Sequence, residues 1–352
     1  MKQKIKNQML LKKRIVSELP KLRLMVLSMI LCISTNLQAC ILELYPMNSG
    51  PTPSMDISNH IVTTTSQSAI MLSNVPTSDW TYGCSNTAAG MIFGYYDRIG
   101  YSDMYTGPAN GGLAPLTDLG NQTSLIATRN GFDGRAVNGH VDDYWISFNS
   151  SLPDPWEGNW SEHAWGDCTS DFMGSNQLKW DFIGGDGIRD YSRDGITAFF
   201  AYNDSRRLYD YTPPSSVGMP QTALSHGMRL FAESRGYSVI ENYTQKIDTL
   251  FDGGFSFADY MAEIDAGFPV MIQLAGHSMV GVGYLEDMQT VYLHDSWGDY
   301  LASMPWGGSY SGMDHIAVTA IHLNPIPEPT TVMIFCCGFV LLRSTGKRHR
   351  FA

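Results

Sequence analysis

Apolar residues recur at helical spacing just after Gly83, which marks a turn. The apolar positions are three or four residues apart, as on the buried face of a helix: Ala88, Met91, Ile92, Tyr95 and Tyr96. Three polar residues near the start are candidates to cap the helix: Ser85, Asn86 and Thr87. The pattern predicts a buried helix that begins at Cys84 or one residue after it.

A second apolar pattern, late in the chain, predicts strands. Residues 268–274 and 277–284 are apolar stretches that meet near Gly276, and a polar turn at 286–289 leads to a further strand over 291–295. This hairpin pattern brings Asp295 into the neighbourhood of His277. Residues 220–235 and 257–266 have helical spacing. Helices combined with an antiparallel sheet predict an α+β fold.

The segment from about 101 to 215 is rich in Gly, Asp, Asn and Trp, and we interpret it as an elaboration of the core. It contains residue types that bind zinc: His140, His163, Asp167, Cys168 and Asp171. Their spacing is irregular, however, and the segment has no Cys-x-x-Cys motif. Asp186, Asp190 and Asp194 recur every four residues and hint at calcium, but they do not match the EF-hand loop, and we interpret them as a solvated acidic loop. We predict no metal and no cofactor.

Charge separates the 352-residue chain into an acidic middle and two basic ends. The formal net charge of −11 argues against a nucleic-acid partner. Residues 1–39 combine a basic stretch, an apolar run over 24–33 and a small-residue site at Ala39, which predicts an export signal and a mature segment from 40 to 69. Lipidation of Cys40 and a retained membrane anchor are the alternatives.

The C-terminal segment, residues 325–352, has Pro327, Glu328 and Pro329, then an apolar stretch over 332–342 and a basic end. This order resembles the PEP-CTERM sorting signal of Gram-negative bacteria. The resemblance implies recognition by export machinery and an exosortase, and a final place in the cell envelope, at the cell surface or in the extracellular matrix. Both terminal segments would contact the membrane before processing, although each apolar run is short for a spanning helix of ~20 residues. A simple tail anchor is the alternative.

Only two of the six cysteines, Cys84 and Cys168, lie within residues 70–322. In an exported protein they form either one disulfide or one reactive thiol with a bystander. The start of a helix favours an anion, which is the nucleophilic form of a thiol, so Cys84 is a candidate nucleophile. A small apolar cysteine in the core is the alternative. His277, flanked by glycine and approached by Asp295, is a candidate general base with a carboxylate to orient it.

A Gly-Cys pair that opens an early helix, followed late by Gly276-His277, Gly283-Tyr284 and Asp295 with Trp297, resembles papain-like cysteine peptidases of the bacteriocin-processing-peptidase-like group. The resemblance covers about residues 70–100 and 220–320. It implies a papain-like domain over 70–322 with an insertion at about 101–215, and hydrolysis of a peptide or protein substrate. Cys84 would be the nucleophile, His277 the general acid and base, and Asp295 the residue that orients His277.

The sequence departs from that family before and after Cys84. Residues 75–80 contain no Gln to bind the oxyanion, so the backbone of Cys84, with Ser78 or Trp80, is the candidate donor set. Ser85-Asn86 replaces the more common Gly-Pro. Three hypotheses follow: an active cysteine peptidase or related thiol amidohydrolase, a catalytically inactive scaffold that binds partners, and a protein whose Cys84 forms a structural disulfide with Cys168.

Overall fold

The computed structural model describes residues 42–47, 49–81, 83–105, 113–118, 125–126, 168–173, 175, 181–183, 189–191, 198–204, 206–212 and 224–325. The predicted export signal, Cys40, the Pro327–Pro329 motif and the histidines of the middle segment lie outside these ranges. From Glu43 onward the described residues belong to one compact unit. Within the described ranges, the helices are too short or too polar to cross a membrane.

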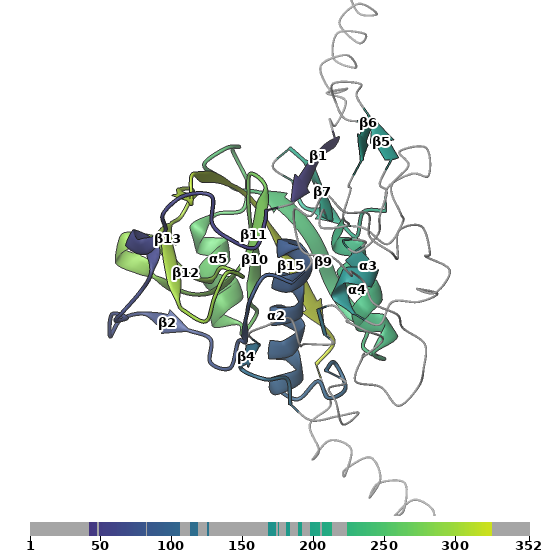
Figure 1. Ribbon diagram of the computed structural model, residues 1–352, viewed down its shortest axis with the longest axis horizontal. Coiled ribbons are helices and arrows are strands. Elements are labelled where there is room, and N and C mark those ends of the chain that lie inside the picture. The colour runs from purple at the N-terminus through teal and green to yellow at the C-terminus, as the bar shows by residue number, and fades with distance from the viewer. Residues whose placement is uncertain are drawn as a thin grey trace, which may run out of the picture. The chain divides into compact units, whose positions relative to one another are not determined.

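An antiparallel sheet organises the described part of the chain (Figure 1). Its strands follow the spatial order β13 (Ala302–Pro305), β12 (Thr290–His294), β11 (His277–Leu285), β10 (Val270–Leu274), β15 (Met313–Leu323), β9 (Val239–Lys246) and β8 (Leu208–Tyr209). Two short strands pair off this path: β2 (Ile70–Met71) with β11, and β14 (Ser309–Tyr310) with β15. The predicted α+β class, in its coarse form of an antiparallel sheet with few helices, is confirmed.

The remaining elements are short or lie outside the main sheet. They are β1 (Leu42–Met47), which pairs with β7 (Ala198–Asn203); β3 (Thr77–Ser78), which pairs with β4 (Thr117–Asp118); β5 (Asp181–Ile183), which pairs with β6 (Arg189–Tyr191); the helix α3 (Thr169–Met173); and the 3₁₀ turns η1 (Ser58–His60) and η3 (Glu286–Met288). Side chains from α3 and β7 join the main hydrophobic cluster.

Helix α2 (Cys84–Arg98) is buried along almost its whole length. Its start at Cys84 confirms the prediction. The expected side-chain cap is wrong, because Gly83 is the N-cap and no side chain caps the helix. Thr87 instead accepts a hydrogen bond from the backbone N–H of Thr81 at 3.0 Å and donates to the carbonyl of Gly83 at 2.6 Å. These bonds hold the loop that precedes Cys84.

Two glycines let α2 pack closely against its neighbours. A Cβ atom at Gly90 would lie 2.3 Å from Ile126 Cγ1, and one at Gly94 would lie 2.9 Å from Pro76 Cγ. Both distances are shorter than real Cβ contacts, so only glycine fits without rearrangement. The close approach of these neighbours helps to bury α2 along its length.

The sheet is covered on both faces (Figure 1). Alternate residues of a strand point to opposite faces. Thus Met271 and Val280 pack with α2 and α4 (Leu224–Ser234), whereas Ile272 and Met279 pack with α5 (Phe257–Asp265). A capping box at Ser256 and Asp259 starts α5. The helices predicted over 220–235 and 257–266 are confirmed within the described residues.

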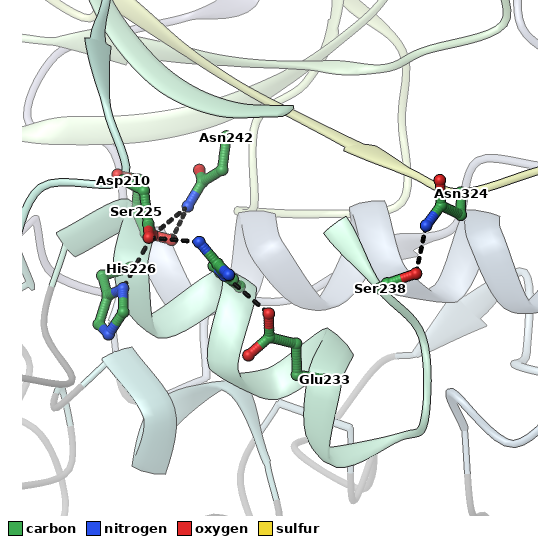
Figure 2. A network of polar contacts seen from close by, with 8 residues as sticks. Asp210, Ser225, His226, Glu233, Ser238, Asn242 and Asn324 are labelled. Atoms are coloured by element: carbon green, nitrogen blue, oxygen red, sulfur yellow. Dashed lines mark hydrogen bonds and ion pairs between the residues drawn. The ribbon is translucent and has the colours of Figure 1, made fainter. Parts of the chain in front are cut away.

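A polar network fixes α4 to the edge of the sheet (Figure 2). The carboxylate of Asp210 bonds to His226 at 2.8 Å and to Arg229 at 2.6 Å, both on α4. Asn242 of β9 donates to the carbonyl of Ser225 at 2.8 Å. The network ties the helix to β9, which neighbours the strand β15.

The bond between Ser85 Oγ and Ser278 Oγ, 2.8 Å long and fully buried, joins the start of α2 to the start of β11. We expect Ser85→Ala alone to lower the free energy of unfolding by about 1–3 kcal/mol, because it leaves a buried hydroxyl without its partner. The Ser85→Ala/Ser278→Ala double variant is expected to cost less than the sum of the single variants. Urea denaturation of the four proteins measures this coupling, and strictly additive losses would contradict it.

Candidate functional site

Cys84 is the first residue of α2, is fully buried and carries a free thiol. The disulfide with Cys168 that the sequence left open is therefore not formed. The first N–H groups of a helix have no acceptor within the helix, and together with the helix dipole they favour a negative charge. Cys84 thus lies at the helix start, where the sequence predicts the candidate nucleophile.

His277 is the first residue of β11, and the start of β11 lies against the start of α2. The residues that follow His277 and Cys84, Ser278 and Ser85, are hydrogen-bonded to each other. A two-residue turn leads into His277, because Leu274 pairs directly with it in the ladder between β10 and β11. The second turn residue, Gly276, has φ +103°, a conformation that side chains disfavour.

The His277 ring has a partner on each nitrogen. Nε2 lies 2.9 Å from the backbone carbonyl oxygen of Asp295, and Nδ1 lies 2.5 Å from Oγ of Ser49. Burial lowers the pKa of His277 to about 3, so the ring is neutral at physiological pH. A carbonyl oxygen only accepts, so Nε2 carries the hydrogen and Nδ1 is the basic nitrogen.

Asp295 is adjacent to His277, as the hairpin pattern predicts, but it presents its backbone carbonyl rather than its carboxylate. The carboxylate accepts three other hydrogen bonds: from the backbone N–H of Trp297 at 3.0 Å, from Tyr300 at 2.9 Å and from Tyr310 at 2.7 Å. Burial raises the pKa of Asp295, and the three donors act in the opposite direction. The carboxylate therefore holds the turn that aims the carbonyl at the ring.

The turn after Asp295 has an unusual conformation. Ser296 is fully buried and has φ +65°, the left-handed region that side chains other than glycine rarely adopt. The turn delivers Trp297, whose indole stacks parallel to the His277 ring with centroids 3.9 Å apart. Strained backbone of this kind persists where its surroundings fix it, and it is frequent at functional sites.

The two candidate oxyanion donors lie in the segment before α2. Ser78 belongs to β3 and donates its hydroxyl to the carbonyl of Asp79 at 3.0 Å, and Trp80 is buried. In the part of the chain that the structure describes, no group of three or more His, Cys, Asp or Glu residues is arranged to hold a metal.

The sequence did not point to three residues that complete the site. They are Ser49, Tyr300 and Tyr310, to which the sequence assigns no role in the site. Ser49 is separated from His277 by 228 positions, so no local pattern links them. A buried carboxylate requires hydrogen-bond donors. The tyrosines that follow Asp295 in the sequence could therefore have been predicted as donors to its carboxylate.

One comparison found a match, and it covers the later part of the described chain. Residues 211–310 match the model of the Peptidase_C39 like family. The matched range contains His277 and Asp295 and does not reach Cys84. No curated protein and no solved structure matches the chain. Over the matched range, the chain is similar to C39-like peptidases, which supports a cysteine peptidase-like protein.

The neutral state of buried histidines makes stability depend on pH. Burial lowers the pKa of both His277 and His315 to about 3, whereas an unfolded histidine titrates near 6.5. Between these values the unfolded chain binds more protons, so the free energy of unfolding falls as the pH falls below about 6.5. Two such groups contribute a slope of about 2.7 kcal/mol per pH unit in the middle of this range.

We expect His277→Gln to remove about half of that slope, and His315→Gln to do the same. Urea denaturation between pH 7 and pH 4.5 measures both. The comparison of variants cancels contributions from other groups, including Asp295, whose raised pKa acts in the opposite direction. An unchanged slope in His277→Gln would mean that this ring is protonated in the folded protein.

Proposed function

We propose that this protein is a cysteine peptidase in which Cys84 is the nucleophile and His277 the general acid and base. The observation that carries the proposal is a free thiol at the start of a buried helix, whose next residue, Ser85, is hydrogen-bonded to the residue after His277. A thiol paired with a histidine is the working unit of nucleophilic catalysis by a thiol. The match to the Peptidase_C39 like family over the His277 and Asp295 segment supports it.

The reaction follows from the state of the ring. Nδ1 of His277 takes the thiol proton of Cys84, and the thiolate forms a C–S bond to the substrate carbonyl. The imidazolium then gives its proton to the amide nitrogen as the C–N bond breaks, which leaves a thioester. Nδ1 next takes a proton from water, whose oxygen attacks the thioester carbonyl. The C–S bond then breaks, the acid product leaves, and the imidazolium returns its proton to the Cys84 sulfur.

Asp295 has an orienting role in this scheme. Its carbonyl accepts the Nε2 hydrogen, which keeps Nδ1 available as the base and stabilises the imidazolium that forms. The parallel indole of Trp297 covers one face of the ring and restricts its rotation. Backbone N–H groups at Cys84, and at Ser78 or Trp80, remain our proposed oxyanion donors.

A second candidate function, a peptidase-like scaffold without activity that binds a partner, has two observations in its favour. Nδ1 of His277 is occupied by Ser49, and the carboxylate of Asp295 is committed to two tyrosines and a backbone N–H. The absence of Gln from residues 75–80 points the same way. In this second function, the chain would use the same fold to bind a peptide without cleaving it.

An electrophilic peptide probe separates the two functions. We expect the wild-type protein and the control Cys168→Ala to form a covalent adduct, because Cys168 has no role in the scheme. Cys84→Ala should form no adduct. His277→Ala should form the adduct about 10²-fold more slowly than wild type, or not at all, because the base is lost. Adduct formation is measured by intact-protein mass spectrometry. Equal labelling of Cys84→Ala and wild type would remove the peptidase proposal.

Export remains part of the proposal. The basic and apolar pattern of residues 1–39, with Cys40 as a possible lipidation site, supports passage through export machinery, and the Pro327–Glu328–Pro329 segment supports processing by an exosortase. The mature protein would then reside in the envelope, at the surface or in the matrix. Mass spectrometry of the protein from producing cells should give a chain that begins at residue 40 and ends near residue 327. An intact chain of 352 residues would contradict both signals.

A further inference from the structure

The segment before the peptidase core crosses the His277 end of the sheet. Ser49 donates its backbone N–H to the carbonyl of Gly276 at 3.0 Å, and its hydroxyl lies 2.5 Å from Nδ1 of His277. The next residue, Gly50, accepts a hydrogen bond from the indole of Trp297 at 2.9 Å. Two consecutive residues therefore contact the turn before His277, the ring itself and the aromatic residue that covers it.

The contact between Ser49 and His277 involves the atom that catalysis requires. Because Nε2–H is directed at the Asp295 carbonyl, Nδ1 is the acceptor and the Ser49 hydroxyl donates to it. A lone pair that accepts this hydroxyl cannot at the same time take the proton of Cys84. In this arrangement the base and the nucleophile are therefore uncoupled.

The segment is docked on both sides of Ser49. We call the described residues 43–47 and 49–62 the strap. On its N-terminal side, Glu43 bonds to the buried ammonium of Lys246 at 2.6 Å, which lowers the pKa of Glu43, and Met47 is fully buried. On its C-terminal side, Ser54 donates to the carbonyl of Ser311 at 3.0 Å.

Further contacts continue the docking beyond Ser54. Met55 donates its backbone N–H to the hydroxyl of Ser311 at 2.9 Å, and Val62 donates to the carbonyl of Leu301 at 2.9 Å. Residues 63–68, which follow the strap, are exposed. The strap is thus held by polar contacts along its length, in addition to the pairing of β1 with β7 and the burial of Met47 and Ile57. The polar contacts of Ser49, Glu43 and Ser54 can be removed one at a time.

We propose that the strap is an internal inhibitor of the site, in which Ser49 and Gly50 lie where the main chain of a peptide substrate binds. The proposal rests on the function proposed above. A substrate would donate its N–H to the Gly276 carbonyl and accept from the Trp297 indole, as the strap does. Displacement of the strap frees Nδ1 of His277 to pair with Cys84, so opening of the strap regulates activity.

The test uses the full chain and two measurements. The first is the rate of alkylation of Cys84 by iodoacetamide, which reports access to a thiol that is fully buried here. The second is hydrolysis of a mixed peptide library. We expect Ser49→Ala to raise both rates roughly two- to tenfold, since loss of one hydrogen bond shifts an opening equilibrium by such a factor. Glu43→Gln should act in the same direction through the anchor at Lys246.

Two control variants separate the contact from general loosening. Ser49→Thr keeps the hydroxyl and should restore the wild-type rates. Ser54→Ala removes a hydroxyl from the same strap that bonds to Ser311 instead of His277, so it should change the rates less than Ser49→Ala does. Equal rates for wild type, Ser49→Ala and Ser54→Ala would overturn the proposal.

The two measurements also distinguish failure of the strap from failure of the peptidase. Faster alkylation of Cys84 in Ser49→Ala, with no hydrolysis by any variant, would support the strap and contradict the peptidase. Hydrolysis that depends on Cys84 and proceeds at the same rate in wild type and Ser49→Ala would support the peptidase and overturn the strap.

Discussion

The hydrogen bond between Nε2 of His277 and the backbone carbonyl of Asp295 decides what this site can do. A carbonyl has no proton to give, so the bond fixes the hydrogen on Nε2 and leaves Nδ1 as the single basic atom of a neutral ring. The direction of every proposed proton transfer follows from that assignment. So does the significance of Ser49, which contacts the one nitrogen able to act as a base.

The rest of the site keeps this bond in place. The Asp295 carboxylate is buried, and an isolated buried charge would be costly. Tyr300, Tyr310 and the N–H of Trp297 satisfy it, and in doing so they clamp the turn that carries the carbonyl. One residue thus acts through two groups: the side chain holds the turn, and the main chain holds the imidazole.

Short-range patterns predicted the elements of the site well. The helix at Cys84 follows from apolar spacing after a glycine, and the strands at His277 and before Asp295 follow from apolar stretches separated by a polar turn. The neighbourhood of His277 and Asp295 follows from the hairpin. Which group of Asp295 faces the ring could not be predicted, because a register shift between β11 and β12 and the left-handed Ser296 set that orientation. The contact between Ser49 and His277 joins residues that are 228 positions apart, so no periodic pattern in the sequence could predict it.

The protonation state of the His277 ring is the central claim, and nitrogen NMR observes it directly. Long-range ¹H–¹⁵N correlation spectra of the uniformly labelled protein, with the signal assigned by its loss in His277→Gln, report which ring nitrogen carries the hydrogen. The account predicts a ring protonated at Nε2 and unprotonated at Nδ1, with shifts that stay constant from pH 8 to pH 5. A hydrogen on Nδ1, or a titration near pH 6.5, would contradict it.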